Sequence, residues 1–379
     1  MKIIYVENVR IPSERAHAYQ IVQTCSWLAK QGHEVVLVNP DRAKGKTVFE
    51  WFGLPPKLFQ HVLINSWDPL SSSFPWKALT YVLQRMSFVR ALRRWAKQAT
   101  ADVWYTRDPA MIDALRGVVP GPWILESHDN PSVDPARWSR VKELISGHVA
   151  ISRGMADRLK ELDVPSDAIL VASDGYDPDE FKNLPVQEEL RRQNGVPEGV
   201  FVALYAGSFY PWKGVELVVT SWDKMPKDWH LILMGGPAPD HARVEALVPT
   251  SVRARVHFLA LRPHADAMRV FPMGDVGLLT SSSKYEIGRR YTSPLKQFEY
   301  LAAGLPILAS DVPSSHEVLD ERTTRFFQPT SDAFVSALQQ VWSDKSWRAS
   351  ASKAGPELVK KYTWEARTQS IVAFIKTRI

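Results

Sequence analysis

The chain has 379 residues, 45% apolar and 23% charged, a globular composition of about two domains. Its net charge of +6 suits an anionic ligand or a lipid surface, whereas the absence of zinc-type Cys/His spacing and of an RNA-binding aromatic motif excludes nucleic acid as an expected partner. The single Cys25, the short apolar run in MKIIYVEN and the lack of any stretch near ~20 apolar residues predict a cytoplasmic protein, at most peripheral at the inner face of the membrane.

The first half of the chain alternates strands with helices. Strands are expected at 2–6, 33–40, 102–106, 122–127 and 147–152. Helices are expected at 13–32, from about 76 to 98, and at 152–164, the first capped by Ser13 and ended by Gly32. Residues 41–76 are rich in proline and aromatic residues and are predicted to be irregular. A turn-rich, charged stretch at 174–200 ends this part of the chain.

The alternation then restarts. Strands are expected at 201–207, 229–236, 255–260, 275–281 and 307–310, with helices at 213–225 and 294–303. This pattern predicts an α/β fold of two doubly wound Rossmann-like domains, 1–180 and 181–362, facing a central cleft, with ligands beyond the carboxyl ends of the strands. The helix at 363–379 is expected to pack back on the N-terminal domain.

One helix start carries an unusual charge. Ser293 is a good N-cap, Pro294 suits the first helical position and Gly304 ends the helix, but Lys296 lies in the first turn, where the helix dipole favours an anion. A lysine beside free backbone N–H groups makes a phosphate site. The alternative is an ordinary surface lysine.

A second lysine follows another strand. In LYAGSFYPWKG, Gly207 comes directly after a strand and Lys213 stands at the start of a helix, although the spacing of a Walker loop is absent. Two lysines at two helix starts of one sheet suit a diphosphate. Glu299, one turn after Lys296, suits two neighbouring hydroxyls such as those of a ribose, or else is an i, i+3 partner of Lys296 worth ~0.2–0.5 kcal/mol.

These segments resemble the retaining GT-B glycosyltransferases of family 4 (GT4). The resemblance rests on GSFYPWKG, HFLALRPHADA and SPLKQFEYLAAGLPILASD in the second domain, and on IPSERAHAYQIVQ, WILESHD, AISRGMADRL and SDGYDPDEF before it. It covers nearly the whole chain. It implies a hexosyltransferase-type enzyme that moves a sugar from a nucleotide sugar to a glycan or glycolipid acceptor in polysaccharide or cell-surface glycan synthesis, with an acceptor-side first domain and a donor-binding second domain.

The resemblance also assigns roles to residues. Lys213 and Lys296 would neutralise the diphosphate, helped by backbone N–H groups near Ser293 and Leu295, while Glu299 would hold the ribose. The remaining expected contacts are Gly207, which lets the backbone approach the phosphates, Ser208 beside it, Leu261 and Arg262 flanking the base, and His128 near the transferred sugar. UDP is the favoured nucleotide and GDP the second. No cofactor or metal is expected, since Asp177-Pro178-Asp179, which resembles a metal-binding motif, lies among turn residues.

Three positions depart from the family pattern. Ser208 stands where an arginine is usual, Tyr291 replaces the first of two glutamates, and VRIPSERAH replaces a glycine loop, so that Arg10 or Arg15 would take over its contacts. Two alternatives therefore stay open. One is a nucleotide-sugar 2-epimerase of the same fold, which needs more catalytic groups than His128; the other is a non-catalytic nucleotide-sugar binding protein.

The helix at 76–98 bears on the acceptor. It combines basic with large apolar residues, which is typical of a helix lying on an anionic membrane surface. A core-facing helix with a solvated basic side explains the pattern equally well. The residues concerned are Arg85, Arg90, Arg93, Arg94, Lys97, Leu83, Phe88, Leu92 and Trp95.

Overall fold

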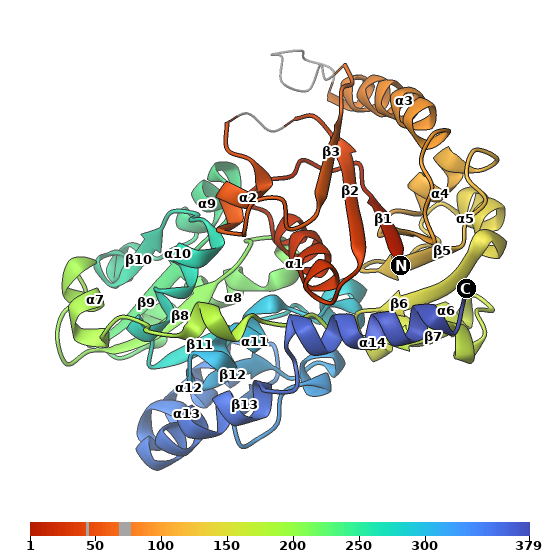
Figure 1. Ribbon diagram of the computed structural model, residues 1–379. Helices are drawn as coiled ribbons and strands as arrows, with labels where there is room; N and C mark the ends of the chain where they lie inside the picture. Colours follow the sequence, from red (N-terminus) through yellow and green to blue (C-terminus); the bar gives the residue numbers. More distant parts are fainter. Residues whose placement is uncertain (43–44, 68–76) are drawn as a thin grey trace. The chain divides into compact units, whose positions relative to one another are not determined.

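The computed structural model describes residues 1–42, 45–67 and 77–379 (Figure 1). The chain divides into two compact units. The first contains Met1–Ile151, Met155–Ser173 and Trp364–Ile379, and the second contains Ser152–Gly154 and Asp174–Thr363. Each has one parallel sheet with helices packed on it, so the chain has the predicted GT-B class of fold.

The first unit has seven strands in the order β3-β2-β1-β4-β5-β6-β7. They are β1 (Lys2–Val6), β2 (Glu34–Pro40), β3 (Gln60–Ile64), β4 (Val103–Thr106), β5 (Trp123–Ser127), β6 (Ile145–Ala150) and β7 (Ile169–Val171). The helices of this half are α1 (Ala16–Lys30), α2 (Val48–Phe52), α3 (Lys77–Ala96), α4 (Pro109–Leu115), α5 (Pro135–Val141) and α6 (Arg153–Glu161). The strand order reverses between β1 and β4, the point where such sheets bind ligands.

The second unit repeats this plan with the order β10-β9-β8-β11-β12-β13. Its strands are β8 (Phe201–Ala206), β9 (Trp229–Met234), β10 (Val256–Leu259), β11 (Val276–Leu279), β12 (Ile307–Ser310) and β13 (Thr324–Phe327). Its helices are α7 (Gln187–Gln193), α8 (Val215–Thr220), α9 (Ala238–Glu245), α10 (His264–Met268), α11 (Leu295–Ala302), α12 (Ser331–Ser343) and α13 (Lys345–Val359). Every residue of β8 and β9 is buried, because helices cover both faces.

Several sequence-based expectations need correction. Within the stretch expected to be irregular lie α2 and the edge strand β3, and the edge strands β7 and β13 were also missed. β3 and β13 begin with polar residues and so lack the continuous apolar run that marks a central strand, while the apolar β7 is only three residues long. The part of that stretch at 68–76, and the expected start of the long helix at Trp76, lie outside the described residues.

Three helix starts also differ from expectation. The N-cap of α1 is Arg15, because the Ser13 side chain is buried, and the N-cap of α11 is Pro294, since the Ser293 hydroxyl accepts a hydrogen bond from the Asp174 N–H at 3.3 Å. The helix expected from Lys213 begins at Val215 and ends at Thr220.

The last helix, α14 (Trp364–Lys376), belongs to the first unit (Figure 1). Gln31 of α1 donates from Nε2 to Thr368 Oγ1 at 2.7 Å, and the rings of Tyr19 and Trp364 lie 6.1 Å apart. Deeper in the unit, the Arg367 guanidinium lies 3.0 Å from Glu126 Oε2, with both side chains almost fully buried. A buried ion pair of this kind costs several kcal/mol when only one partner is removed.

We therefore expect Arg367→Met to lower the free energy of unfolding by about 3–5 kcal/mol, since it leaves the Glu126 carboxylate buried without its cation. Urea denaturation measures the change. Lys376→Met, an exposed position at the end of the same helix, is the control and should change stability little. The double variant Arg367→Met/Glu126→Gln should recover part of the loss. A loss below about 1 kcal/mol in Arg367→Met would contradict the uncompensated-charge argument.

Candidate functional site

In the second unit, two loops meet at the carboxyl edge of β8 and β11, where the strand order reverses. The hydroxyl of Thr280 donates to the Lys213 carbonyl at 2.6 Å, and the N–H of Ser282 donates to the Trp212 carbonyl at 2.9 Å. These two bonds fix the loop after β8 against the loop after β11. The site is therefore built on the rigid ends of two adjacent strands.

Two glycines permit this close packing. Gly214 has a φ of +67°, and a Cβ there would lie 3.4 Å from the Ser282 nitrogen. Gly235, after β9, has a φ of +119°, and its Cβ would lie only 2.3 Å from the carbonyl oxygen of Gly207. Both the left-handed backbone and the close approach exclude a side chain at these positions. Gly207 is thereby held at the strand end, and its N–H donates to the Met234 carbonyl at 2.9 Å.

Lys213 ends the short 3-10 turn Pro211–Lys213, and Gly214 caps the following α8. The Nζ of Lys213 lies 4.1 Å from the centroid of the Trp212 ring. Burial, and after it the positive charge of Lys296, lower the pKa of Lys213 to about 8. This second effect shows that the two lysines are close enough to repel one another, which favours an anion between them.

Lys296 and Glu299 are in direct contact on α11. Lys296 Nζ donates to Glu299 Oε2 at 2.5 Å, as the i, i+3 alternative requires. The Glu299 side chain is only 2% exposed, and its other oxygen, Oε1, accepts no hydrogen bond. His264 Nε2 lies 3.6 Å from that oxygen and 3.2 Å from Glu180 Oε2. Buried carboxylate oxygens normally accept a hydrogen bond, so the lack of a donor to Glu299 Oε1 indicates that a ligand supplies one.

The other predicted site residues of this unit lie in the surrounding loops. Leu295 is the buried first residue of α11, and Ser208 accepts from the Tyr205 hydroxyl through its carbonyl at 2.6 Å. Leu261 is exposed and Arg262 half-exposed in the loop between β10 and α10. Tyr291, which ends a single π-helical turn over Ile287–Tyr291, is buried.

The acidic pair in the linker forms a turn, as predicted. Asp177 caps the 3-10 turn Pro178–Phe181 by accepting from the Asp179 N–H at 3.0 Å, and Asp179 pairs with Lys182 at 2.6 Å. Across residues 1–42, 45–67 and 77–379, no three His, Cys, Asp or Glu side chains are gathered as ligands of one metal ion.

In the first unit, His128 follows β5 and is held by a charged network. Its Nε2 lies 2.5 Å from Glu126 Oε1, while Glu126 Oε2 accepts from the Tyr105 hydroxyl and pairs with Arg367. Burial lowers the pKa of His128 to about 3, so the ring is neutral at neutral pH. The neutral ring donates from Nε2 to the carboxylate, which leaves Nδ1 as an acceptor.

Glu126 is the ionised member of this network. Burial disfavours its charged form, but Arg367 and the His128 hydrogen bond outweigh burial and hold the pKa of Glu126 well below its usual range. Sequence reasoning missed Glu126 and Arg367, together with His264 and Glu180 in the second unit. A glutamate inside the apolar strand WILES was the available signal, because an ionised residue in a buried strand needs a partner.

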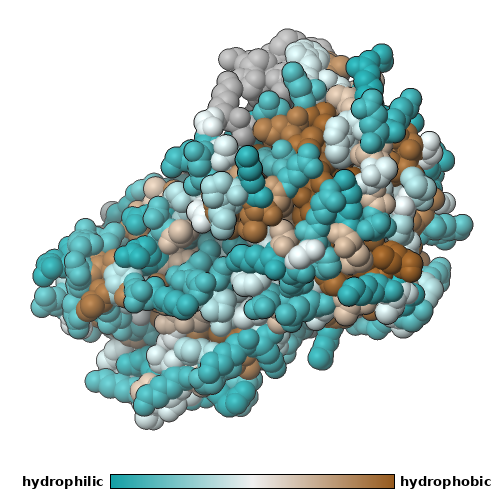
Figure 2. All heavy atoms as spheres, viewed as in Figure 1, coloured by the Kyte–Doolittle hydropathy of each residue, from teal (hydrophilic) through white to brown (hydrophobic). Residues whose placement is uncertain are grey.

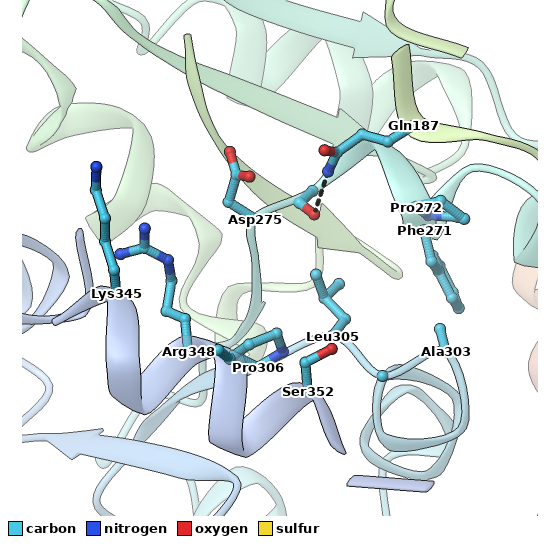
Figure 3. A pocket seen from close by; sticks show the side chains of 13 residues that line it. Gln187, Phe271, Pro272, Asp275, Ala303, Leu305, Pro306, Lys345, Arg348 and Ser352 are labelled. Carbon is cyan, nitrogen blue, oxygen red and sulfur yellow. Dashed lines mark hydrogen bonds between the residues drawn. The ribbon is translucent and has the colours of Figure 1, made fainter. Parts of the chain in front are cut away.

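A separate cavity of about 360 Å³ lies at the opposite, amino end of the second sheet (Figure 3). Asp275 and Pro306, which line it, directly precede β11 and β12. Two of the charged residues that line it already have partners, since Asp275 pairs with Arg191 at 2.9 Å and Arg348 donates to the Val341 carbonyl at 2.5 Å. The carboxyl edge therefore remains the better candidate site.

Comparison with known families decides the class of protein. The family model described as "Glycosyl transferases group 1" matches residues 200–344, and the one described as "Glycosyltransferase Family 4" matches residues 18–180. The chain belongs to glycosyltransferase family 4. In this family member, the match to residues 18–180 covers most of the first unit. The match to residues 200–344 includes Gly207, Lys213, Lys296 and Glu299.

Individual relatives are distant. The D-inositol 3-phosphate glycosyltransferase of Corynebacterium glutamicum (strain R) is 25% identical over 226 residues, which cover 56% of this chain and 52% of that protein. The lipopolysaccharide 1,2-N-acetylglucosaminetransferase of Salmonella typhimurium is 24% identical over 215 residues, covering 53% and 55%. The chain thus spans about half the length of the curated relatives it matches.

Solved structures share the fold over the full chain. The sucrose-phosphate synthase of Thermosynechococcus elongatus matches with a TM-score of 0.82 and 20% identity, covering 99% of this chain and 98% of that one. Anabaena HepE in complex with UDP-glucose matches with a TM-score of 0.77 and 16% identity, covering 100% of both.

The pKa of Lys213 leads to a testable pH dependence. Without ligand, Lys213 is charged below about pH 8, and a bound diphosphate raises its pKa above that value. The affinity for the diphosphate should therefore be constant below about pH 8 and fall as the pH rises above it. We expect the affinity for UDP-glucose, measured by calorimetry between pH 7 and 9, to fall several-fold in the wild type. Lys213→Arg, which stays charged, should lose this dependence, and the exposed control Lys284→Arg should keep it. Equal pH profiles for wild type and Lys213→Arg would refute the assignment.

Proposed function

We propose that this glycosyltransferase moves a sugar, with retention, from a nucleoside-diphosphate sugar to a glycan or glycolipid acceptor, with a UDP-sugar favoured and a GDP-sugar second. The observation that carries the proposal is the buried Glu299, whose Oε1 lacks a donor while Lys296 contacts its other oxygen and Lys213 lies near enough to Lys296 to feel its charge. A ribose hydroxyl would supply the missing donor. The complex of the similar HepE with UDP-glucose supports the nucleotide.

The chemistry follows from charge. The bond to the diphosphate breaks when negative charge on its oxygens is stabilised, and fixed cations achieve this with little reorganisation. Lys213 and Lys296 fill that role in the proposal, with the N–H groups at Ser293 and Leu295 as further donors, so no metal is required. Leu261 and Arg262 flank the base, and Gly207 and Ser208 line the phosphates. The neutral His128, with Nδ1 as acceptor, serves the transferred sugar.

The deciding experiment is a metal-free thermal-shift panel of UDP, GDP, ADP and their sugars. A ligand at 100 times its dissociation constant stabilises by ~2.7 kcal/mol. We expect one nucleotide to give this shift in the wild type and to lose most of it in Lys296→Met, whereas Lys284→Met, an exposed lysine of a neighbouring loop, should behave as wild type. The difference in shift between UDP and 2′-deoxy-UDP reports on the contact of Glu299 with the ribose. Glu299→Met should abolish this difference, and Lys296→Met should not.

No shift with any nucleotide would refute the proposal. If the nucleotide binds, incubation of the bound sugar donor separates the remaining alternatives. Transfer to an acceptor with the anomeric configuration kept supports the enzyme, and an epimerised donor formed without acceptor indicates an isomerase.

The acceptor side of the proposal concerns α3. Phe88 and Leu92 are fully buried in the first unit, as the alternative of a core-facing helix requires. Other large apolar residues of the same helix and the neighbouring β3 region are exposed instead, and Figure 2 shows hydrophobic side chains gathered there. They are Leu63, Trp67, Leu79, Tyr81, Val82 and Met86, followed along the helix by the exposed cations Arg90, Arg94 and Lys97. We infer that this surface lies on an anionic membrane.

No helix among the described residues has the length and apolarity to cross a bilayer. We expect the protein to co-sediment with phosphatidylglycerol-containing liposomes at low salt and to be released at high salt. Tyr81→Ser/Met86→Ser should reduce the bound fraction several-fold. Val133→Ser, an exposed apolar residue elsewhere in the unit, is the control and should have no effect. Equal sedimentation with and without liposomes would count against the membrane surface.

A further inference from the structure

Arg107 stands at the carboxyl edge of the sheet in the first unit, and its charge contributes to the lowered pKa of His128. It directly follows β4, which lies beside β1 at the point where the strand order reverses. Its backbone N–H donates to Glu7 Oε1 at 2.5 Å, and its guanidinium donates to Gln20 Oε1 at 3.0 Å and to the His17 carbonyl at 3.4 Å. The half-exposed guanidinium is thus held in one position.

The Arg107 guanidinium has no directly paired carboxylate among the described residues, although its charge acts on the nearby Glu126 and Glu7. No carboxylate oxygen of the described residues lies within 4.0 Å of its guanidinium. Burial, with Asp108 adding to it, raises the pKa of the nearby Glu7 to about 8, so that this carboxyl is protonated at neutral pH. Asp108 itself caps α4 by accepting from the Ala110 N–H at 2.8 Å. The positive charge is therefore available to a ligand.

Hydrogen-bond donors without partners surround the same edge. Asn8 Nδ2, Ser13 Oγ and Ser127 Oγ are buried and have no partner. Asn8 and Ser13 lie in the loop between β1 and α1, and Ser127 ends β5, which pairs with β4. Buried donors normally find an acceptor, so three without one indicate a missing acceptor-rich group. Together with a guanidinium, they suit the oxygens of a phosphate.

We propose that Arg107, with the donors of the β1–α1 loop and the end of β5, binds a phosphate group of the acceptor. The acceptor would then be a phosphorylated sugar or a saccharide linked to a lipid through phosphate. This inference deepens the proposed function and rests on it, because it takes the second unit as the donor side. A phosphate of the donor is the competing source of the same chemistry.

The test uses inorganic phosphate and glucose 6-phosphate as probes, titrated by calorimetry into the full chain saturated with UDP, with glucose as the matched ligand without phosphate. We expect both phosphates to bind in the wild type and glucose to bind at least tenfold more weakly than its phosphate. Arg107→Gln should lose at least tenfold in phosphate affinity. Arg107→Lys should lose less, because it keeps the charge but not the fork of donors. Arg116→Gln, an exposed cation beyond α4, should behave as wild type.

Three outcomes would overturn the proposal. They are phosphate affinity unchanged in Arg107→Gln, no saturable phosphate binding in the UDP-loaded wild type, and an equal loss of UDP affinity in Arg107→Gln, which would assign the residue to the donor. Gln20→Leu keeps Arg107 but removes the hydrogen bond that orients its guanidinium, and we expect it to lower phosphate affinity about threefold. This variant tests the proposal even if Arg107→Gln folds poorly. If UDP does not bind the wild type, the proposed function fails, while the phosphate titration without UDP still decides the role of Arg107.

Discussion

The burial of both sheet faces is the constraint on which the rest of this structure depends. In β8 and β9 every residue is buried, and the backbone hydrogen bonds are satisfied between parallel strands. Polar chemistry is consequently confined to the strand ends. Thr280, Arg107 and His128 come within two residues of the end of a strand, and the glycines after β8 and β9 allow the adjoining loops to pack closely.

The pair of Lys296 and Glu299 illustrates how magnitudes separate structure from function. An exposed pair at this spacing contributes only ~0.2–0.5 kcal/mol to a helix. Glu299 is 2% exposed, and burying a carboxylate costs several kcal/mol, so the pair is a poor means of stabilising α11. The burial of the Glu299 carboxylate is better explained by the proposed ligand, which presents hydroxyls to the carboxylate and phosphates to the lysine.

The two units differ in the origin of the positive charge at the carboxyl edge of their sheets. In the second, burial and the charge of Lys296 lower the pKa of Lys213, so an anion is favoured there. In the first, the ionised Glu126 has Arg367 and His128 as partners, while burial raises the pKa of Glu7 to about 8 and Arg107 has no directly paired carboxylate among the described residues. Both edges thus present positive charge, by close approach of cations in one unit and by protonation of a carboxyl in the other.

The sequence by itself determined the central strands, the class of fold and the lysine at the start of α11, because each is a local signal: an apolar run, an alternation of periods, a charge opposed to a helix dipole. It also indicated Glu299, one turn away on the same helix. Only the tertiary structure decided that Arg367 pairs with Glu126, that His264 approaches Glu299, and that Ser13 is buried rather than a cap. These contacts join residues far apart in the chain or depend on burial, and no local pattern encodes which distant side chain satisfies a buried charge.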